Sequence, residues 1–192
     1  DARLIFPRYH QRRAVLHIVG DVKEKGAGHR YLIQHSAGSG KSNTITWLAF
    51  RLSNLYRTVE DEKPIFDSVL VVTDRRVLDR QLQNNLRQFQ ITEGEVKYID
   101  NKCNSQDLKR AIEDRKRIIV TTLQKFPVIS DTIRLFPDRK YAVIIDEAHS
   151  SQSGEAARQM RKALSLEEAE AFDAEDVKGA DSEDLLNNII ES

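Results

Sequence analysis

Two short stretches of the sequence carry residues suited to binding and hydrolysing a nucleoside triphosphate. The first is a loop rich in glycine and serine, QHSAGSGKSNTI, at residues 34–45. Gly38 and Gly40 allow the main chain to curl tightly, so that its N–H groups can point at anionic oxygens. Lys41 would place an ammonium group on the phosphates, and Ser42 would offer a hydroxyl group to Mg²⁺. The predicted nucleotide-binding residues of this loop are Ala37, Gly38, Ser39, Gly40, Lys41 and Ser42.

The loop departs from the strict phosphate-loop pattern, G-x-x-x-x-G-K-[ST], at one position. His35 stands where the first glycine is expected, while the rest of the pattern is intact. The alternative is a flexible linker of serine and glycine with a chance lysine. The setting favours the phosphate loop, because a strand candidate precedes it and a helical pattern follows it.

The second stretch is VIIDEAH, at residues 143–149. Its apolar residues predict the end of a buried strand, and two acids follow directly. Asp146 would hold Mg²⁺, through water, and Glu147 would orient and polarise the attacking water. A charged strand end is common in α/β proteins, but it does not explain the combination with a phosphate loop earlier in an alternating chain. The two stretches together predict hydrolysis of a Mg²⁺–nucleotide complex.

The elements that must position these residues alternate along the chain. Apolar residues at helical spacing predict helices, and short continuous apolar runs predict strands. The predicted helices span 7–26, 45–55, 75–89, 106–115 and 155–164, and the predicted strands span 31–33, 69–72, 96–99, 118–120 and 141–145. This alternation predicts an α/β fold with a mainly parallel sheet and helices on both of its faces.

Composition narrows the class of protein. The chain has 192 residues, of which 40% are hydrophobic, and no run approaches the ~20 apolar residues of a membrane span. It begins with Asp1 and shows no secretory signal, so we expect a piece of a longer protein. Cys103 is its single cysteine, which excludes an internal disulfide and fits a reducing, cytoplasmic setting.

Charge is distributed unevenly, although the formal net charge is zero. Residues 167–192 contain ten acidic residues and one basic residue, which leaves 29 basic and 20 acidic residues in 1–166. A basic body is compatible with nucleic-acid binding, and the alternative is an ordinary solvated surface. We expect residues 166–192 to form an acidic, partly helical extension to a domain that spans 1–165.

These motifs resemble those of the first motor lobe of a superfamily 2 helicase, which implies a three-layer, RecA-like P-loop NTPase domain. DEAH at 146–149 is similar to the second motif of that family, AGSGKS at 37–42 to its first, and PRYHQ at 7–11 to an element upstream. The resemblance implies that Gln11 selects the adenine of ATP. It also implies that His149 couples the γ-phosphate to the motifs that face nucleic acid.

Two further stretches resemble family motifs that contact the nucleic-acid backbone, VVTDRRVLDRQL at 71–82 and VTTLQKF at 120–126. Contacts of this type position the protein without reading sequence. The alternatives are a solvated helix face in the first stretch and a polar strand end in the second. The implied contact residues are Thr73, Arg75, Arg76, Arg80, Thr121, Thr122 and Lys125.

One branch of the family fits more closely. HSAGSGKSNTI, VVTDRRVLDRQL and DEAHSSQSGE together resemble the restriction subunit of type I restriction enzymes, over about residues 5–165. The resemblance implies ATP-driven translocation of double-stranded DNA in the bacterial or archaeal cytoplasm. It implies a nuclease domain and a second motor lobe elsewhere in the polypeptide, with methyltransferase and specificity subunits as partners.

Two other functions stay open at this point. One is a helicase or remodeller that acts on single strands or RNA, and the other is a nucleotide-binding regulatory module without turnover. The chain contains no second lobe that could supply an arginine to the γ-phosphate, and such a residue contributes ~10³–10⁵ in rate in related chemistry. We therefore expect the isolated chain to bind ATP and hydrolyse it slowly.

Overall fold

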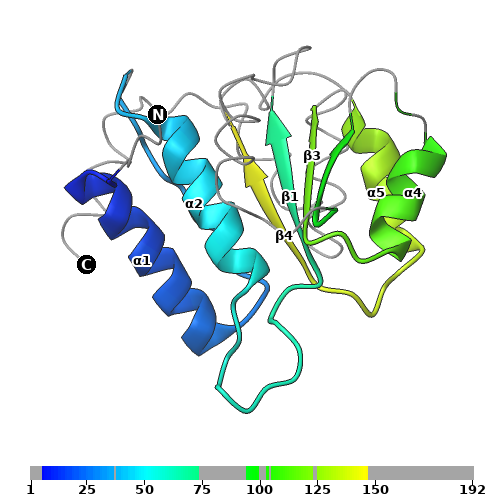
Figure 1. Cartoon of the computed structure of the whole chain (residues 1–192), viewed down its shortest axis with the longest axis horizontal. Coiled ribbons are helices and arrows are strands. Elements are labelled where there is room, and N and C mark those ends of the chain that lie inside the picture. The colour runs from blue at the N-terminus through cyan, green and yellow to red at the C-terminus, as the bar shows by residue number, and fades with distance from the viewer. Residues whose placement is uncertain are drawn as a thin grey trace, which may run out of the picture.

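A four-stranded parallel sheet forms the centre of the molecule (Figure 1). The computed structural model describes residues 6–36, 38–73, 94–99, 103, 105–122 and 125–146. The strand order is β2-β3-β1-β4, and each of the three pairings is parallel. The strands are β1 (Ser68–Thr73), β2 (Val96–Ile99), β3 (Ile118–Thr122) and β4 (Tyr141–Ile145). The predicted α/β class and the parallel sheet are confirmed.

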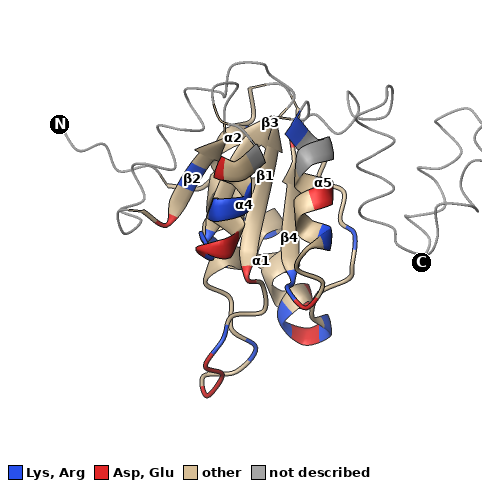
Figure 2. Cartoon of the chain, turned by 90° about the vertical axis from the view of Figure 1, so that its right-hand side faces the viewer, with Lys and Arg blue, Asp and Glu red and all other residues tan. Residues whose placement is uncertain are grey.

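The two middle strands are buried along their whole length because side chains pack on both of their faces. In β1, Val69 and Val71 point to one face and Leu70 and Val72 to the other, as the two-residue period of a strand requires. Figure 2 shows β1, β3 and β4 without Lys, Arg, Asp or Glu, whereas charged residues of both signs lie on the helices and loops. Such strands can be accommodated only under helices on both sides.

Helices supply the two outer layers (Figure 1). On one face, α2 (Lys41–Ser53) packs on the sheet and α1 (Tyr9–Lys25) packs on α2. The other face is covered by α4 (Ser105–Glu113) and α5 (Phe126–Arg134). The result is the predicted three-layer arrangement. No helix among the described residues is both long and apolar enough to cross a lipid bilayer.

The strand predicted at 31–33 is wrong, because these residues join no strand ladder. The Tyr31 hydroxyl donates a hydrogen bond to Asp21 Oδ2 of α1 at 2.5 Å, and Lys25 Nζ lies 2.6 Å from the other oxygen of that carboxylate. Burial and this hydrogen bond raise the pKa of Tyr31 to about 12. Ile33 packs against the core while Leu32 is 88% exposed. The apolar triplet is thus tied to helix α1 instead of pairing in the sheet.

Helix α5 was not predicted, because the β-branched residues of 126–134 do not favour a helix. Its sequence has a proline in the first turn, where proline is tolerated, and Ile129 and Ile133 lie on one face against the second core cluster. Tertiary packing against α4 and the second core cluster therefore decides its conformation. The helices predicted at 75–89 and 155–164 lie outside the described residues.

Candidate nucleotide-binding site

The phosphate loop leads directly into helix α2 and depends on two glycines. Gly38 has φ +73° and Gly40 has φ +84°, a region that L side chains rarely adopt. A Cβ atom on Gly40 would also lie 2.5 Å from Nε2 of Gln11. Gly40 is the N-cap residue of α2, and it brings no side chain to cap the helix. Both glycines are therefore required by the main-chain shape of the loop.

The N-terminal end of α2 is electrostatically suited to an anion. The first N–H groups of a helix have no partner within the helix, and the helix dipole adds partial positive charge there. The first turn of α2 contains no acidic residue, and its first two residues are Lys41 and Ser42. A phosphate group at this position would meet main-chain N–H groups, an ammonium group and a hydroxyl group together.

The two predicted motifs meet in space through an ion pair. Lys41 Nζ lies 3.0 Å from Asp146 Oδ1, with side chains that are 34% and 17% exposed. Asp146 follows β4 directly, and its N–H donates to the carbonyl of Val72 at 2.8 Å, so the sheet fixes its position. A carboxylate beside the phosphate-loop lysine is suited to hold Mg²⁺ on the phosphates of a nucleotide. Lys41, Ser42 and Asp146 are thus brought to one place.

Gln11 joins this site through hydrogen bonds to the main chain of the loop. It is 3% exposed, and its Nε2 donates to the carbonyls of Ser39 at 3.1 Å and Gly40 at 2.9 Å. Its Oε1 accepts from the N–H of Arg8 at 2.8 Å. In this arrangement the amide holds the phosphate loop against the start of α1. Its selection of adenine stays a prediction.

The carboxyl edge of the sheet carries three of the residues predicted to contact nucleic acid. Thr73 and Thr122 are register partners at the ends of β1 and β3, in line with Asp146 beyond β4. Thr73, Thr121 and Thr122 are buried, and Thr73 Oγ1 donates to the carbonyl of Thr121 at 3.4 Å. Within the described part of the chain, the hydroxyls of Thr121 and Thr122 have no hydrogen-bond partner. Contact of these groups with a nucleic acid requires a rearrangement that exposes them.

The remaining predicted residues are divided between one that is described and several that are not. Lys125 lies at the start of α5, and its Nζ donates to the carbonyl of Cys103 at 3.1 Å, so it ties the β3–α5 connection to the segment before α4. The predicted residues that lie outside the described part of the chain are Ala37, Arg75, Arg76, Arg80, Glu147 and His149.

Comparison with known protein families agrees with this geometry. The family model for the SWI2/SNF2 ATPase matches residues 10–177, which include the phosphate loop and the acids after β4. The chain belongs to the SWI2/SNF2 ATPase family.

Individual relatives of this SWI2/SNF2 ATPase domain come from bacteria and archaea. It is 29% identical to the type I restriction enzyme SauCOLORF180P endonuclease subunit of Staphylococcus aureus, over 84% of this chain and 16% of that protein. It is 30% identical to the putative type I restriction enzyme MjaVIIIP endonuclease subunit of Methanocaldococcus jannaschii, over 83% and 17% respectively. The chain thus spans about a sixth of the length of these two relatives. The predicted resemblance to type I restriction subunits is confirmed.

A solved structure supports the RecA-like fold of the SWI2/SNF2 ATPase domain. The UvsW helicase from bacteriophage T4 superposes with a TM-score of 0.57, over 85% of this chain and 50% of that one. The sequence identity is 16%, so the likeness concerns the fold.

Sequence reasoning missed two histidines of the site. His10 Nε2 lies 3.2 Å from the carbonyl oxygen of Ser39, and His35 Nδ1 lies 3.0 Å from its hydroxyl oxygen. The available signals were the histidine in place of the first glycine and the histidine beside Gln11. Neither showed that both would converge on Ser39, since that depends on how α1 packs beside the loop.

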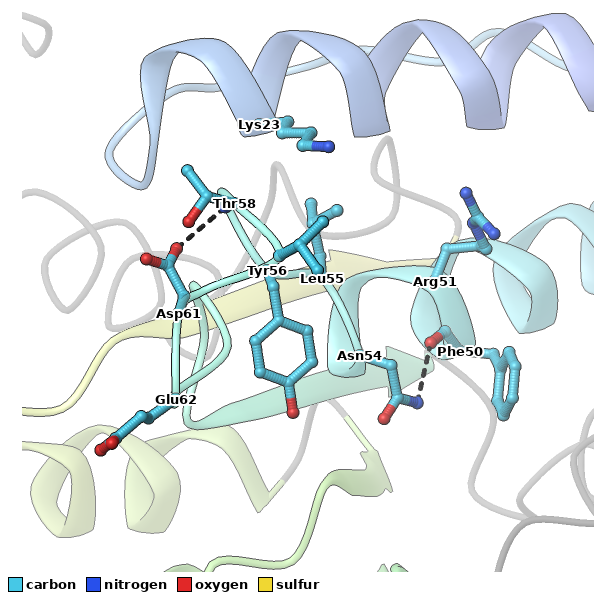
Figure 3. A pocket seen from close by; sticks show the side chains of 10 residues that line it. Lys23, Phe50, Arg51, Asn54, Leu55, Tyr56, Thr58, Asp61 and Glu62 are labelled. Carbon is cyan, nitrogen blue, oxygen red and sulfur yellow. Dashed lines mark hydrogen bonds between the residues drawn. The ribbon is translucent and has the colours of Figure 1, made fainter.

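An open depression of about 620 Å³ lies at the other end of α2 in this SWI2/SNF2 ATPase domain (Figure 3). Basic and acidic residues both line it, and the hydrogen bonds drawn there are local, from Thr58 N–H to Asp61 Oδ2 at 3.0 Å and from Asn54 Nδ2 to the carbonyl of Phe50 at 3.4 Å. None of the predicted site residues lines it. The nucleotide site is therefore defined by the phosphate loop and not by this depression.

Proposed function

We propose that this chain is the ATP-binding motor lobe of a type I restriction endonuclease subunit, which uses ATP hydrolysis to move double-stranded DNA. The proposal rests on the similarity of the chain to relatives that are named as endonuclease subunits of type I restriction enzymes. It also rests on the chemistry of the site, which the ATPase family of the chain requires.

The observation that carries the proposal is the approach of Lys41 Nζ to Asp146 Oδ1 at 3.0 Å, at the N-terminal end of α2. A Ser/Gly linker would have no reason to end beside a strand-end carboxylate. The pairing joins the group that binds phosphate to the group that binds a divalent cation, as phosphoryl transfer requires. It therefore favours Mg–ATP over a nucleotide-free binding function.

Each residue of the site has an assigned part in hydrolysis. The loop N–H groups and Lys41 bind the phosphates, while Ser42 and Asp146 are the residues suited to hold Mg²⁺, which neutralises phosphate charge when it is bound. Glu147, the next residue in the sequence, is assigned to orient the attacking water and accept its proton. Gln11 supports the loop, and its assigned contact with adenine requires release of the loop carbonyls that it now holds.

DNA engagement is assigned to the carboxyl edge of the sheet, since ligands of open α/β sheets bind beyond the strand ends. Thr73 lies at this edge on β1, the strand next to β4 and Asp146, and Thr121 and Thr122 lie on β3, one strand further away, so exposure of their hydroxyls would link DNA contact to the nucleotide site. Arg75, Arg76, Arg80 and Lys125 would add positive charge to the backbone contact. His149 is assigned to the coupling between the γ-phosphate and these groups.

The proposal extends to the surroundings of the domain. Residues 1–165 are the motor lobe and 166–192 an acidic extension, in a cytoplasmic enzyme. A second motor lobe and a nuclease domain complete the subunit, which works with methyltransferase and specificity subunits. Without the second lobe we expect turnover by this chain alone to stay well below the typical enzyme median of ~10 s⁻¹.

The test is ATP hydrolysis by the complete subunit, assembled with its modification and specificity subunits. Four stimulants are compared, namely duplex DNA with a recognition site, the same duplex without the site, single-stranded DNA and RNA. We expect strong stimulation only by the duplex that carries the site, and loss of it in Lys41→Ala. Stimulation by single strands or RNA without partners would support a helicase instead. Nucleotide binding without any stimulated turnover would support a regulatory module.

A further inference from the structure

Ser39, in the middle of the phosphate loop, is held from three directions. Its N–H donates to the carbonyl of Ser36 at 3.2 Å, which closes a tight turn. His35 Nδ1 lies 3.0 Å from its hydroxyl oxygen, so a side chain closes the same turn a second time. Ser39 is only 8% exposed as a result.

The carbonyl of Ser39 is held from the side of α1. Gln11 Nε2 donates to it at 3.1 Å and His10 Nε2 lies at 3.2 Å. Because a carbonyl oxygen can only accept, Nε2 of His10 must carry the proton of this hydrogen bond. The rings of His10 and His35 meet edge to face, with centroids 5.7 Å apart and an interplanar angle of 68°. The two imidazoles and the amide of Gln11 thus all contact Ser39 and hold it in place.

His35 is suited to hold the loop as a neutral side chain and not to bind phosphate as an additional cation. Among the described residues its Nε2 is buried and has no hydrogen-bond partner. In the neutral tautomer with the proton on Nδ1, the ring donates to the Ser39 hydroxyl and has no N–H group on Nε2, whereas protonation would bury an N–H group there without an acceptor. Burial, with the nearby charges of His10 and Lys41, lowers the pKa of His35. The ammonium group of Lys41 is therefore the cation of the loop, and the neutral imidazole of His35 holds the conformation of the loop.

We propose that His35 is a positioning residue that orders the phosphate loop before the nucleotide binds, by fixing Ser39 through its hydroxyl. A loop whose main chain is already ordered loses less conformational entropy on binding. One consequence can be measured: His35→Gly, which restores the strict phosphate-loop pattern, weakens nucleotide binding. The inference rests on the proposed function, since it concerns how the same loop binds ATP.

The test measures the dissociation constant of MgADP by isothermal titration calorimetry for the full 192-residue chain. We expect His35→Gly to raise it by about 10-fold, the effect of a lost hydrogen bond in an ordered loop. His35→Asn should recover most of the affinity, because an asparagine side chain can place a nitrogen or oxygen near the position of Nδ1, whereas His35→Leu should not. His29→Gly and His29→Asn, in an exposed segment outside the site, are the matched controls and should leave the constant unchanged.

Ser39→Ala removes the other half of the hydrogen bond without altering the main chain. It should weaken binding as His35→Gly does, and the double variant should be no weaker than either single one, since the two residues share one interaction. If His35→Gly unfolds at the assay temperature, Ser39→Ala and His35→Leu carry the same expectation.

Two failures are distinguishable. Unchanged or tighter binding in His35→Gly, or in Ser39→Ala, with a wild-type chain that binds MgADP, overturns this inference and leaves the proposed function standing. A folded wild-type chain that does not bind MgADP, and does not differ from Lys41→Ala, overturns the proposed function and this inference together.

Discussion

The two ends of helix α2 differ in what they offer a ligand. The N-terminal end begins at Gly40, has an ion pair of Lys41 with Asp146, and is held by side chains from α1 and the loop. The C-terminal end opens into a depression of about 620 Å³, lined by Lys23, Arg51, Asp61 and Glu62 among others. This end has charges of both signs, the hydrogen bonds drawn in Figure 3 are local, and the carbonyl of Ser53 accepts from Arg117 Nη1 at 3.4 Å.

This difference follows from the polarity of the helix. Its N-terminal end has positive partial charge and N–H groups that point outward, which suits phosphate. At its C-terminal end the carbonyls point outward, and Arg51 in the last turn is the favourable partner for them. The presence of a depression therefore does not identify the site, whereas converging groups of complementary charge do. Paired substitutions at the two ends test this contrast.

Lys41→Ala should have the largest effect. Removal of the ammonium group eliminates charge-assisted hydrogen bonds to the phosphates and leaves Asp146 without its counter-ion. We expect the dissociation constant of MgATP to rise by about 100-fold or more, measured by calorimetry. Arg51→Ala, a cation removed from the other end of the same helix, should change it by less than about 2-fold. An equal effect of the two substitutions would contradict the proposed difference between the two ends of α2.

Asp146→Asn should come next. The amide keeps the shape of the carboxylate and loses the charge that attracts Mg²⁺. Nucleotide affinity should fall by about 10- to 30-fold when Mg²⁺ is present and change little when it is chelated, a fold-change typical of a lost charged contact. Asp61→Asn, in the depression, serves as the control and should show neither effect. A Mg²⁺ dependence that survives in Asp146→Asn would remove this residue from the cation site.

Gln11→Ala should have a smaller effect on affinity and a clear effect on stability. It removes the donor to two loop carbonyls and the acceptor for the Arg8 N–H. We expect a loss of about 2 kcal/mol in the free energy of unfolding and about a 10-fold loss of nucleotide affinity. Asn54→Ala removes an amide from the other end of α2 and should leave affinity unchanged. Denaturant unfolding and calorimetry measure the two quantities.

The smallest effect concerns pH. The pKa of His35 is lowered in the folded chain, chiefly by burial, so the unfolded chain binds a proton more readily. Because His35 is neutral in the folded chain, its contribution to the free energy of unfolding is complete above the ordinary histidine pKa of 6.5. This contribution is lost as the pH falls below 6.5. We expect His35→Asn to lose part of this decrease, measured by denaturant unfolding between about pH 5 and 8. His29→Asn should retain the whole decrease, and identical pH profiles for the two variants would contradict the assignment.

The sequence determined the fold class and the chemistry of the site, because both depend on local patterns. Continuous apolar runs must be covered on both faces, and this requirement predicted a parallel sheet between helices. The phosphate loop was predicted from Gly38, Gly40 and Lys41, which precede a helical pattern. The acid after the last strand was assigned from its position at a strand end. These signals require no knowledge of which segments meet.

Only the tertiary structure decided three other features. The triplet at 31–33 has the composition of a strand, but Asp21 of α1 binds Tyr31 and the ladder does not form. Residues 126–134 lack a strong helical preference, yet packing on the second core cluster makes them α5. His10 and His35 are 25 positions apart, and they contact the carbonyl and the hydroxyl of Ser39 respectively. These features depend on contacts with another element, namely α1 for Tyr31 and for Ser39 and the second core cluster for α5, and local propensities of a few tenths of a kcal/mol do not encode such contacts.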